Sequence, residues 1–165
     1  MTVIDAQTRS EIIEAYNHYA EGIDTKNWPL VRSCFAEEVF IDYGETGAAT
    51  GGAGAIRKAE DWLSALQSVI NGFDVTRHTI TNHRFRATAE GIECRAYFNA
   101  EHIIFNDPEI NHVTDDESVF VIGEYTNVFC QGDSGWKISK SKLVAEFTKG
   151  NIGLFVTAGE RAAKS

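Results

Sequence analysis

The sequence predicts one α+β domain, in which N-terminal helices pack in the concave face of a curved, mostly antiparallel sheet. Two observations point to this class. Apolar residues follow the helical period in the first part of the chain, and long β-rich runs follow from Phe73 onward. Helices followed by antiparallel strands are typical of α+β domains. A length of 165 residues suits one core, so residues 1–165 are expected to form a single domain.

The first helix is expected over residues 7–23, from apolar residues spaced three or four apart: Ile12, Ile13, Tyr16, Tyr19, Ala20 and Ile23. Asn27 can cap a second, short helix that has Trp28 and Pro29 in its first turn. The run "VFIDYG" then favours a strand. The first part of the chain is therefore expected to contain two helices followed by a short strand.

A glycine-rich segment, residues 44–54, is interpreted as a loop, and a lid over a cavity mouth is the alternative. It lacks the ending of a phosphate-binding P-loop. A third helix is expected from about Ile56 to Val69, with Trp62, Leu66 and Val69 on its inner face. The position of the loop beside the helices is the reason to consider it as a lid.

Four long runs in the second half predict strands: "VTRHTITNHRFRAT", "GIECRAYFNAEHIIF", "SVFVIGEYTNVFCQ" and "GWKISKSKLVAEFT". The segments "AEG" and "QGDSG" between them favour hairpin turns. Ala96, Phe98, Ala100 and His102 alternate along one strand, so we expect them on one face. Apolar residues on both faces of the late strands predict a homodimer or homotrimer that covers the outer face.

The charge balance excludes several classes of partner. A formal net charge of -9 argues against nucleic acid and against an anionic membrane surface. The sequence has no apolar stretch near the ~18 residues of a membrane span and no secretion signal. Its three cysteines are widely spaced, which favours reduced thiols in a cytoplasmic protein over disulfides or a zinc site.

The stretches "YAEGIDTKNWPLVRSCFAEEVFIDYG", "RHTITNH" and "GEYTNVFCQGDSGWKISKSKLVAEFTKGN" resemble the SnoaL-like branch of the NTF2-like superfamily, over roughly residues 8–151. The resemblance implies a cone-shaped fold. Within that branch the pattern is similar to scytalone dehydratase, hexachlorocyclohexane dehydrochlorinase and bile-acid 7α-dehydratase. These enzymes work without a cofactor or a metal, so neither is expected here.

The resemblance implies a catalytic pair, Asp24 at the end of the first helix and His78 at the start of the sheet, with Tyr19 as a third catalytic residue. The residues can do this chemistry: a neutral histidine accepts a proton near pH 7, and an aspartate on its other nitrogen stabilises the imidazolium. A helix end disfavours a carboxylate. We therefore expect Asp24→Asn to leave the fold at least as stable.

Four further residues are expected to bind substrate. The resemblance gives His102 as a second pocket histidine and places Ser141 where the dehydrochlorinase has an arginine. Tyr16 shares the apolar face of the first helix with Tyr19, and it is otherwise a core residue. Asn82 lies four residues after His78, which on a regular strand is the same face.

These residues predict a cofactor-independent lyase or dehydratase. His78 would remove a proton from a carbon acid, and a neighbouring oxygen would leave, as in loss of water. The same base could instead drive a carbon–carbon cleavage, such as loss of formaldehyde from a hydroxymethyl side chain. The substrate is expected to be hydrophobic, aromatic or polycyclic. The alternatives are an isomerase that uses the same pair, or a non-catalytic protein that binds small molecules or resembles the β subunit of a dioxygenase.

Overall fold

Helices occupy both ends of the chain, and long strands fill its second half. The computed structural model describes residues 3–44, 54–109 and 112–164. Its elements are, in order, α1 (Ala6–Asp24), α2 (Trp28–Ser33), β1 (Phe35–Asp42), β2 (Ala55–Lys58), α3 (Ala59–Ile70), β3 (Val75–Thr88), β4 (Gly91–Ile103), η2 (Asp115–Glu117), β5 (Ser118–Gly132), β6 (Gly135–Gly150) and α4 (Leu154–Ala162). The predicted α+β class is confirmed.

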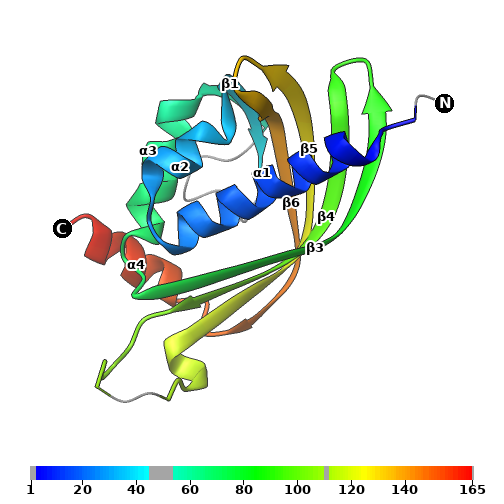
Figure 1. Cartoon of the computed structure of the whole chain (residues 1–165). Helices are drawn as coiled ribbons and strands as arrows, with labels where there is room; N and C mark the ends of the chain where they lie inside the picture. Colours follow the sequence, from blue (N-terminus) through cyan, green and yellow to red (C-terminus); the bar gives the residue numbers. More distant parts are fainter. Residues whose placement is uncertain (1–2, 45–53, 110–111, 165) are drawn as a thin grey trace.

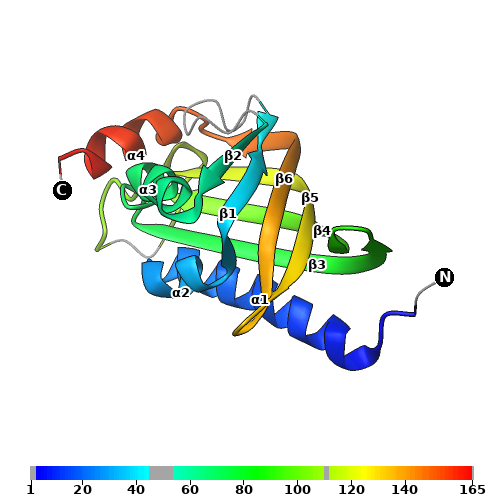
Figure 2. The same ribbon diagram turned by 90° about the horizontal axis from the view of Figure 1, so that it is seen from above.

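Within the described chain, the strands form one sheet in the order β2-β1-β6-β5-β4-β3. β1 and β6 are parallel, and every other neighbouring pair is antiparallel. The predicted sheet is therefore confirmed as mostly antiparallel. Figure 1 shows the long strands curving behind the helices. Seen from above, α1 runs along one side of the sheet while α3 and α4 lie towards the other (Figure 2).

The curvature of the sheet comes from irregular pairing. The register shifts between Thr81 and Arg84 where β3 pairs with β4, and again between Ile122 and Gly123 where β5 pairs with β6. An extra residue on one strand bends that strand and increases its twist. At Gly123 the carbonyl of Val144 lies where a Cβ would be, so only glycine allows this close approach.

The helices follow the predicted pattern closely. α1 buries Ile12, Tyr16, Tyr19 and Ile23, which lie on one face. Asn27 caps α2, and its side-chain oxygen accepts a hydrogen bond from the backbone N–H of Leu30 at 3.3 Å. α1 and α2 therefore present one apolar face to the concave side of the sheet, and the predicted helices in front of it are confirmed.

The start of the third helix differs from the prediction. Residues 55–58 form strand β2 on the edge of β1, so α3 begins at Ala59 rather than near Ile56. Pairing with a neighbouring strand overrides the local preference of these residues. In α3 the buried face includes Trp62, Leu66 and Ile70. The proposed lid at 44–54 falls mainly on residues 45–53, which lie outside the described residues.

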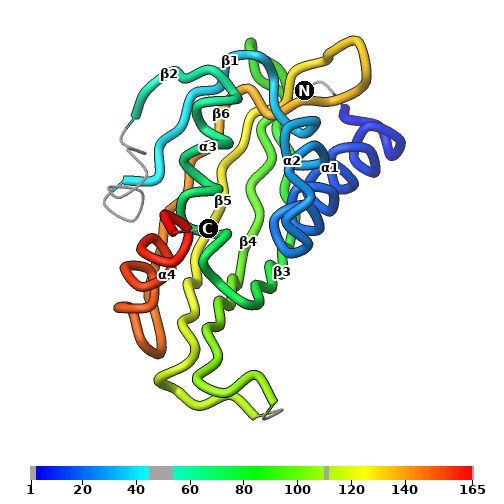
Figure 3. Tube along the Cα trace, turned by 90° about the vertical axis from the view of Figure 1, so that its left-hand side faces the viewer, coloured from blue at the N-terminus to red at the C-terminus, as the bar shows by residue number. Residues whose placement is uncertain are grey.

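The C-terminal helix α4 was not predicted. Leu154 and Ala158 form its buried side and pack with Phe73, Ile104 and Val119. Figure 3 shows α1 and α2 on one side of the central strands and α3 and α4 on the other. None of the described helices is long and apolar enough to cross a membrane.

Candidate active site

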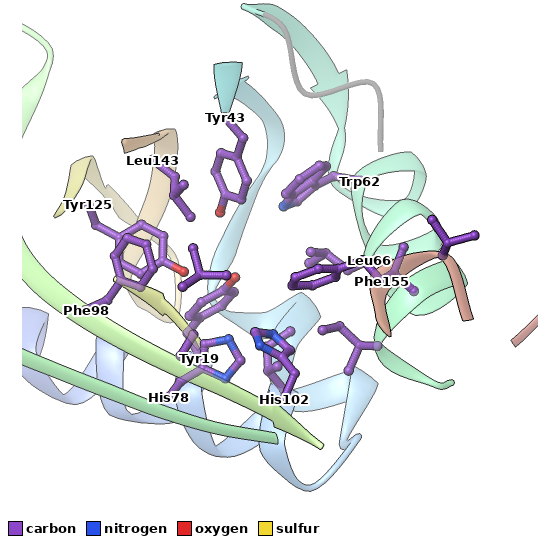
Figure 4. Close-up of a pocket in the computed structure, with 16 residues that line it drawn as sticks. Tyr19, Tyr43, Trp62, Leu66, His78, Phe98, His102, Tyr125, Leu143 and Phe155 are labelled. Atoms are coloured by element: carbon purple, nitrogen blue, oxygen red, sulfur yellow. The ribbon is translucent and has the colours of Figure 1, made fainter. Parts of the chain in front are cut away.

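A cavity of about 230 Å³ lies between the helices and the concave face of the sheet. Its wall is mostly aromatic and aliphatic, with contributions that include Trp62, Leu66, Phe98, Val121, Leu143 and Phe155. Besides Trp62 with its indole N–H, five side chains with polar atoms line it: Tyr19, Tyr43, His78, His102 and Tyr125 (Figure 4). A few polar groups in an apolar hollow are typical of sites that bind small molecules.

Asp24 and His78 meet at one side of this cavity. One carboxylate oxygen of Asp24, Oδ1, lies 2.7 Å from Nδ1 of His78, and the other, Oδ2, accepts from the backbone N–H of His78 at 2.9 Å. The hydroxyl of Thr76 donates to Oδ1 at 2.8 Å. The side chains of His78 and Asp24 are only 7% and 11% exposed. With its Nδ1–H directed at a carboxylate, the imidazole presents Nε2 as its basic nitrogen.

The charge of Asp24 is stabilised in the fold. Burial raises the pKa of this carboxyl, but the hydrogen bonds and charge of His78 and the hydroxyl of Thr76 outweigh burial, so its pKa lies below the usual value. A lowered pKa means that the native state favours the ionised form. Three hydrogen bonds to Asp24 oppose the unfavourable helix end, so the structure favours a loss of stability in Asp24→Asn over the unchanged or higher stability expected from the helix end alone.

His102 comes from β4 and lies next to His78. The two ring centroids are 5.5 Å apart, at 82° to one another. The predicted alternation of Ala96, Phe98, Ala100 and His102 on one buried face is confirmed. Burial and the neighbouring His78 lower the pKa of His102 to about 3, so its imidazole is neutral at physiological pH. Its Nδ1 is buried and has no hydrogen-bond partner among the described residues.

Three tyrosine hydroxyls form a cluster in the cavity. Figure 4 shows the hydroxyl oxygens of Tyr19, Tyr43 and Tyr125 turned towards one another. Burial, followed by the neighbouring Tyr125 and Tyr43, raises the pKa of Tyr19 well above its usual range. Burial likewise raises the pKa of Tyr43 and Tyr125. All three therefore stay protonated and can donate a hydrogen bond at neutral pH.

Ser141 and Tyr16 are buried but do not line the cavity. The hydroxyls of Ser141 and Tyr43 are 3.2 Å apart, so Ser141 contacts Tyr43 behind the cavity wall. Tyr16 donates its hydroxyl hydrogen to the carbonyl of Cys94 at 2.9 Å. Its ring packs on Phe129 and His83. The structure thus places Tyr16 in the core, where the helix period also predicts it.

Asn82 lies outside the cavity, and the expectation that it shares a face with His78 is wrong. The strand has an irregularity here: the pairing with β4 shifts register between Thr81 and Arg84, and Asn82 has a positive φ of 57°. An inserted residue reverses the facing of every residue after it. Asn82 is exposed, and the next residue, His83, turns inward onto Tyr16.

Sequence reasoning missed several residues of the cavity. Tyr43 follows the end of β1, and Tyr125 lies on the inward face of β5. The alternation in "SVFVIGEYTNVFCQ" could have assigned Tyr125 to the buried face, since Val119 and Val121 share it. Phe155 depends on α4, which was not expected. The spacing of Leu154, Phe155 and Ala158 was its available signal.

The chain belongs to the SnoaL-like domain family, which matches residues 5–142. The resemblance predicted from the sequence is thereby confirmed. A comparison with curated proteins finds no match.

Solved structures share the whole fold. The Kfla4162 protein from Kribbella flavida is 26% identical with a TM-score of 0.74, and the match covers 96% of this chain and 99% of that one. A candidate scytalone dehydratase from Novosphingobium aromaticivorans is 17% identical with a TM-score of 0.68, covering 90% and 98%. A hexachlorocyclohexane dehydrochlorinase from Novosphingobium barchaimii is 19% identical with a TM-score of 0.66, covering 89% and 92%. The fold is therefore the NTF2-like α+β cone.

Proposed function

We propose that the protein is a lyase that works without a cofactor on a hydrophobic small molecule, with His78 as general base. The observation that carries this proposal is the pair formed by Asp24 and His78, whose 2.7 Å contact lies at the wall of an apolar cavity. A buried imidazole with an ion-pair partner on one nitrogen can use the other nitrogen to accept a proton. Structures with the same fold that carry the names of a dehydratase and a dehydrochlorinase support the reaction class.

The proposed reaction has two parts. Nε2 of His78 removes a proton from a carbon that is acidified by a neighbouring carbonyl or aromatic ring, and the electron pair left on that carbon forms a new double bond as the bond to a β-hydroxyl breaks. Asp24 stabilises the imidazolium that results. The departing hydroxide takes up the proton held by His78, so water is released and the base is restored. Tyr19, which stays protonated, donates a hydrogen bond to the leaving oxygen or to the oxygen on which negative charge develops. Loss of formaldehyde and double-bond isomerisation would use the same base.

The cavity favours a small substrate. At about 230 Å³, it suits a compound of one or two rings better than a four-ring skeleton. Aromatic side chains on several sides, including Phe98, Tyr125 and Phe155, favour an aromatic substrate that can stack against them. We therefore propose a hydroxylated aromatic compound with one or two rings as the substrate class.

Product analysis with a matched variant tests this proposal. Wild-type protein and His78→Gln are each incubated with a panel of hydroxylated aryl-alkyl compounds in deuterated buffer. Mass spectrometry follows loss of water or formaldehyde, and NMR follows exchange of the carbon-bound hydrogen. We expect conversion or exchange with the wild type and a fall of roughly 10²–10⁴ with His78→Gln. Equal activity of the two proteins would rule out His78 as the base.

The same panel separates the alternatives. An isomerase would exchange hydrogen and shift a double bond without losing mass. A protein that only binds small molecules would show ligand binding but neither exchange nor conversion by the wild type. A structural subunit would copurify with a larger, iron-containing partner. The buried Asp24–His78 pair favours the enzyme, because the imidazole of His78 also lines the cavity, which a purely structural contact does not require.

A further inference from the structure

Trp62 carries a buried hydrogen-bond donor that the proposed reaction does not use. Its side chain is fully buried, and its indole Nε1–H has no hydrogen-bond partner among the described residues. The other two tryptophans have partners: Trp28 donates to Asn71 and Trp136 donates to Glu11, each at 3.1 Å. Buried donors in folded proteins are nearly always paired, so the exception at Trp62 calls for a partner.

The position of Trp62 indicates what kind of partner this is. Trp62 lines the cavity from α3, and Figure 4 shows its indole nitrogen facing the interior, across the cavity from His78. The nearest ring is that of Tyr43, 5.0 Å away between centroids and at 80° to the indole. An aromatic ring is a far weaker acceptor than an oxygen. The Tyr43 hydroxyl itself contacts Ser141.

We propose that Trp62 is a substrate-binding residue whose Nε1–H donates to a carbonyl or ether oxygen at the end of the substrate remote from His78. This inference rests on the proposed function, because it concerns the same cavity. It narrows the substrate class to aromatic compounds with two polar ends. One end carries the acidic C–H that faces His78, and the other carries an acceptor oxygen. A hydrocarbon of the same shape would leave the buried N–H of Trp62 without a hydrogen bond, so it should bind more weakly than a compound with an acceptor oxygen.

The three indole N–H signals of the protein give a direct test. A ¹H–¹⁵N spectrum resolves one signal for each tryptophan, and Trp62→Phe assigns the relevant one. The probes are 1-tetralone and tetralin, two bicyclic compounds of nearly equal shape of which only the ketone has an acceptor oxygen. We expect 1-tetralone to move the Trp62 signal downfield and to leave those of Trp28 and Trp136 in place. Tetralin controls for the ring current and should produce no downfield shift.

Affinity measurements complete the test. By titration calorimetry, Trp62→Phe should weaken 1-tetralone binding by about two- to tenfold, which is the effect of one hydrogen bond. The dissociation constant for tetralin should be nearly the same in the variant and the wild type. Equal shifts of the Trp62 signal with both probes would overturn the proposal, as would the absence of any shift with 1-tetralone. The titrations are repeated in His78→Gln. If 1-tetralone but not tetralin shifts the Trp62 signal in this variant, Trp62 binds the acceptor oxygen whether or not His78 is the base. The two proposals can therefore fail independently.

Discussion

Asp24 binds His78 at two points, the ring through Oδ1 and the backbone N–H through Oδ2. One carboxylate therefore fixes both the orientation of the imidazole and the position of strand β3 against the end of α1. The contact with the ring prevents the imidazole from rotating about its side-chain bonds, and the contact with the backbone N–H prevents β3 from sliding along α1. Neither contact alone would restrain both motions. The pair is a structural joint as well as a candidate catalytic unit.

Asp24→Asn is therefore expected to lower both activity and stability. The amide cannot hold an imidazolium, so turnover should fall by roughly 10²–10⁴. The free energy of unfolding at pH 7 should fall by roughly 1–3 kcal/mol, as hydrogen bonds to a charged group are lost. Because the carboxyl pKa is lowered by folding, its contribution is present above the unfolded value and disappears as pH falls through the folded one. Urea unfolding at pH 7 and at pH 3 measures the difference.

Thr76→Val is the matched control for this variant. It removes the 2.8 Å hydrogen bond to Asp24 but keeps the charge of Asp24 and the shape of the side chain at position 76. We expect a loss of about 0.5–1.5 kcal/mol in stability and an effect on turnover well below that of Asp24→Asn. Equal losses of turnover in the two variants would mean that the geometry of Asp24, and not its charge, matters for activity.

Tyr19→Phe and Tyr16→Phe form a second matched pair on helix α1. Tyr19 lines the cavity, whereas the hydroxyl of Tyr16 donates to the carbonyl of Cys94 in the core. We expect Tyr19→Phe to lower turnover by roughly a hundredfold or more with little change in melting temperature. Tyr16→Phe should lower stability by about 0.5–1.5 kcal/mol and leave turnover unchanged. The reverse pattern would assign the catalytic hydroxyl to Tyr16.

His102 is expected to make the fold sensitive to mild acid. Its pKa is about 3 in the folded protein, against about 6.5 in the unfolded chain. The unfolded state therefore binds the extra proton, and stability falls as pH drops from about 6.5 towards 3. His102→Gln should reduce the slope of unfolding free energy against pH in this range by up to about 1.4 kcal/mol per pH unit. Denaturant titrations at pH 7, 5.5 and 4.5 check the slope, and an unchanged slope would contradict the assignment.

The outer face of the sheet predicts a homodimer or homotrimer. Tyr97, Val144 and Phe147 are apolar and 44%, 48% and 58% exposed, and pairing across β4, β5 and β6 brings them to one outer face with Ile122. Such a patch is typical of an interface. Light scattering should give a mass above that of one chain, and Phe147→Glu should lower it. Val3→Glu, an exposed apolar residue outside the patch, should leave the mass unchanged, and a monomeric wild type would refute the prediction.

Periodicity predicted most of the fold because the chain is locally consistent. The first helix, the cap at Asn27 and the alternation that ends at His102 each follow from residues near one another in the sequence. The errors came from contacts between distant residues. β2 exists because it pairs with β1, and α4 has a buried side because Phe73 and Val119 lie beneath it. The local spacing of Leu154, Phe155 and Ala158 indicates the helix α4 but not what covers it, and no local pattern indicates the pairing of β2.

The candidate site was predicted unevenly for the same reason. The resemblance supplied Asp24 and His78, and the structure brings them together at hydrogen-bond distance. Their roles in catalysis stay a prediction. The helical period predicted Trp62 on the inner face of α3, but only the packing of α3 and β1 brings Trp62 and Tyr43 to the cavity, and no local pattern distinguished Tyr43 from the other aromatic residues.

The irregularity at Asn82 divides β3 into two segments with opposite phase. Before it, the inward residues are Thr76, His78 and Ile80, and after it they are His83 and Phe85. The facing of a residue after Asn82 therefore cannot be assigned by counting in steps of two from His78. In an alignment of relatives, the two halves of β3 must be matched separately. Otherwise, a relative without the extra residue would have every later position assigned to the wrong face. Deleting Asn82 from this protein should restore regular pairing between β3 and β4 and keep His83 and Phe85 on the inward face.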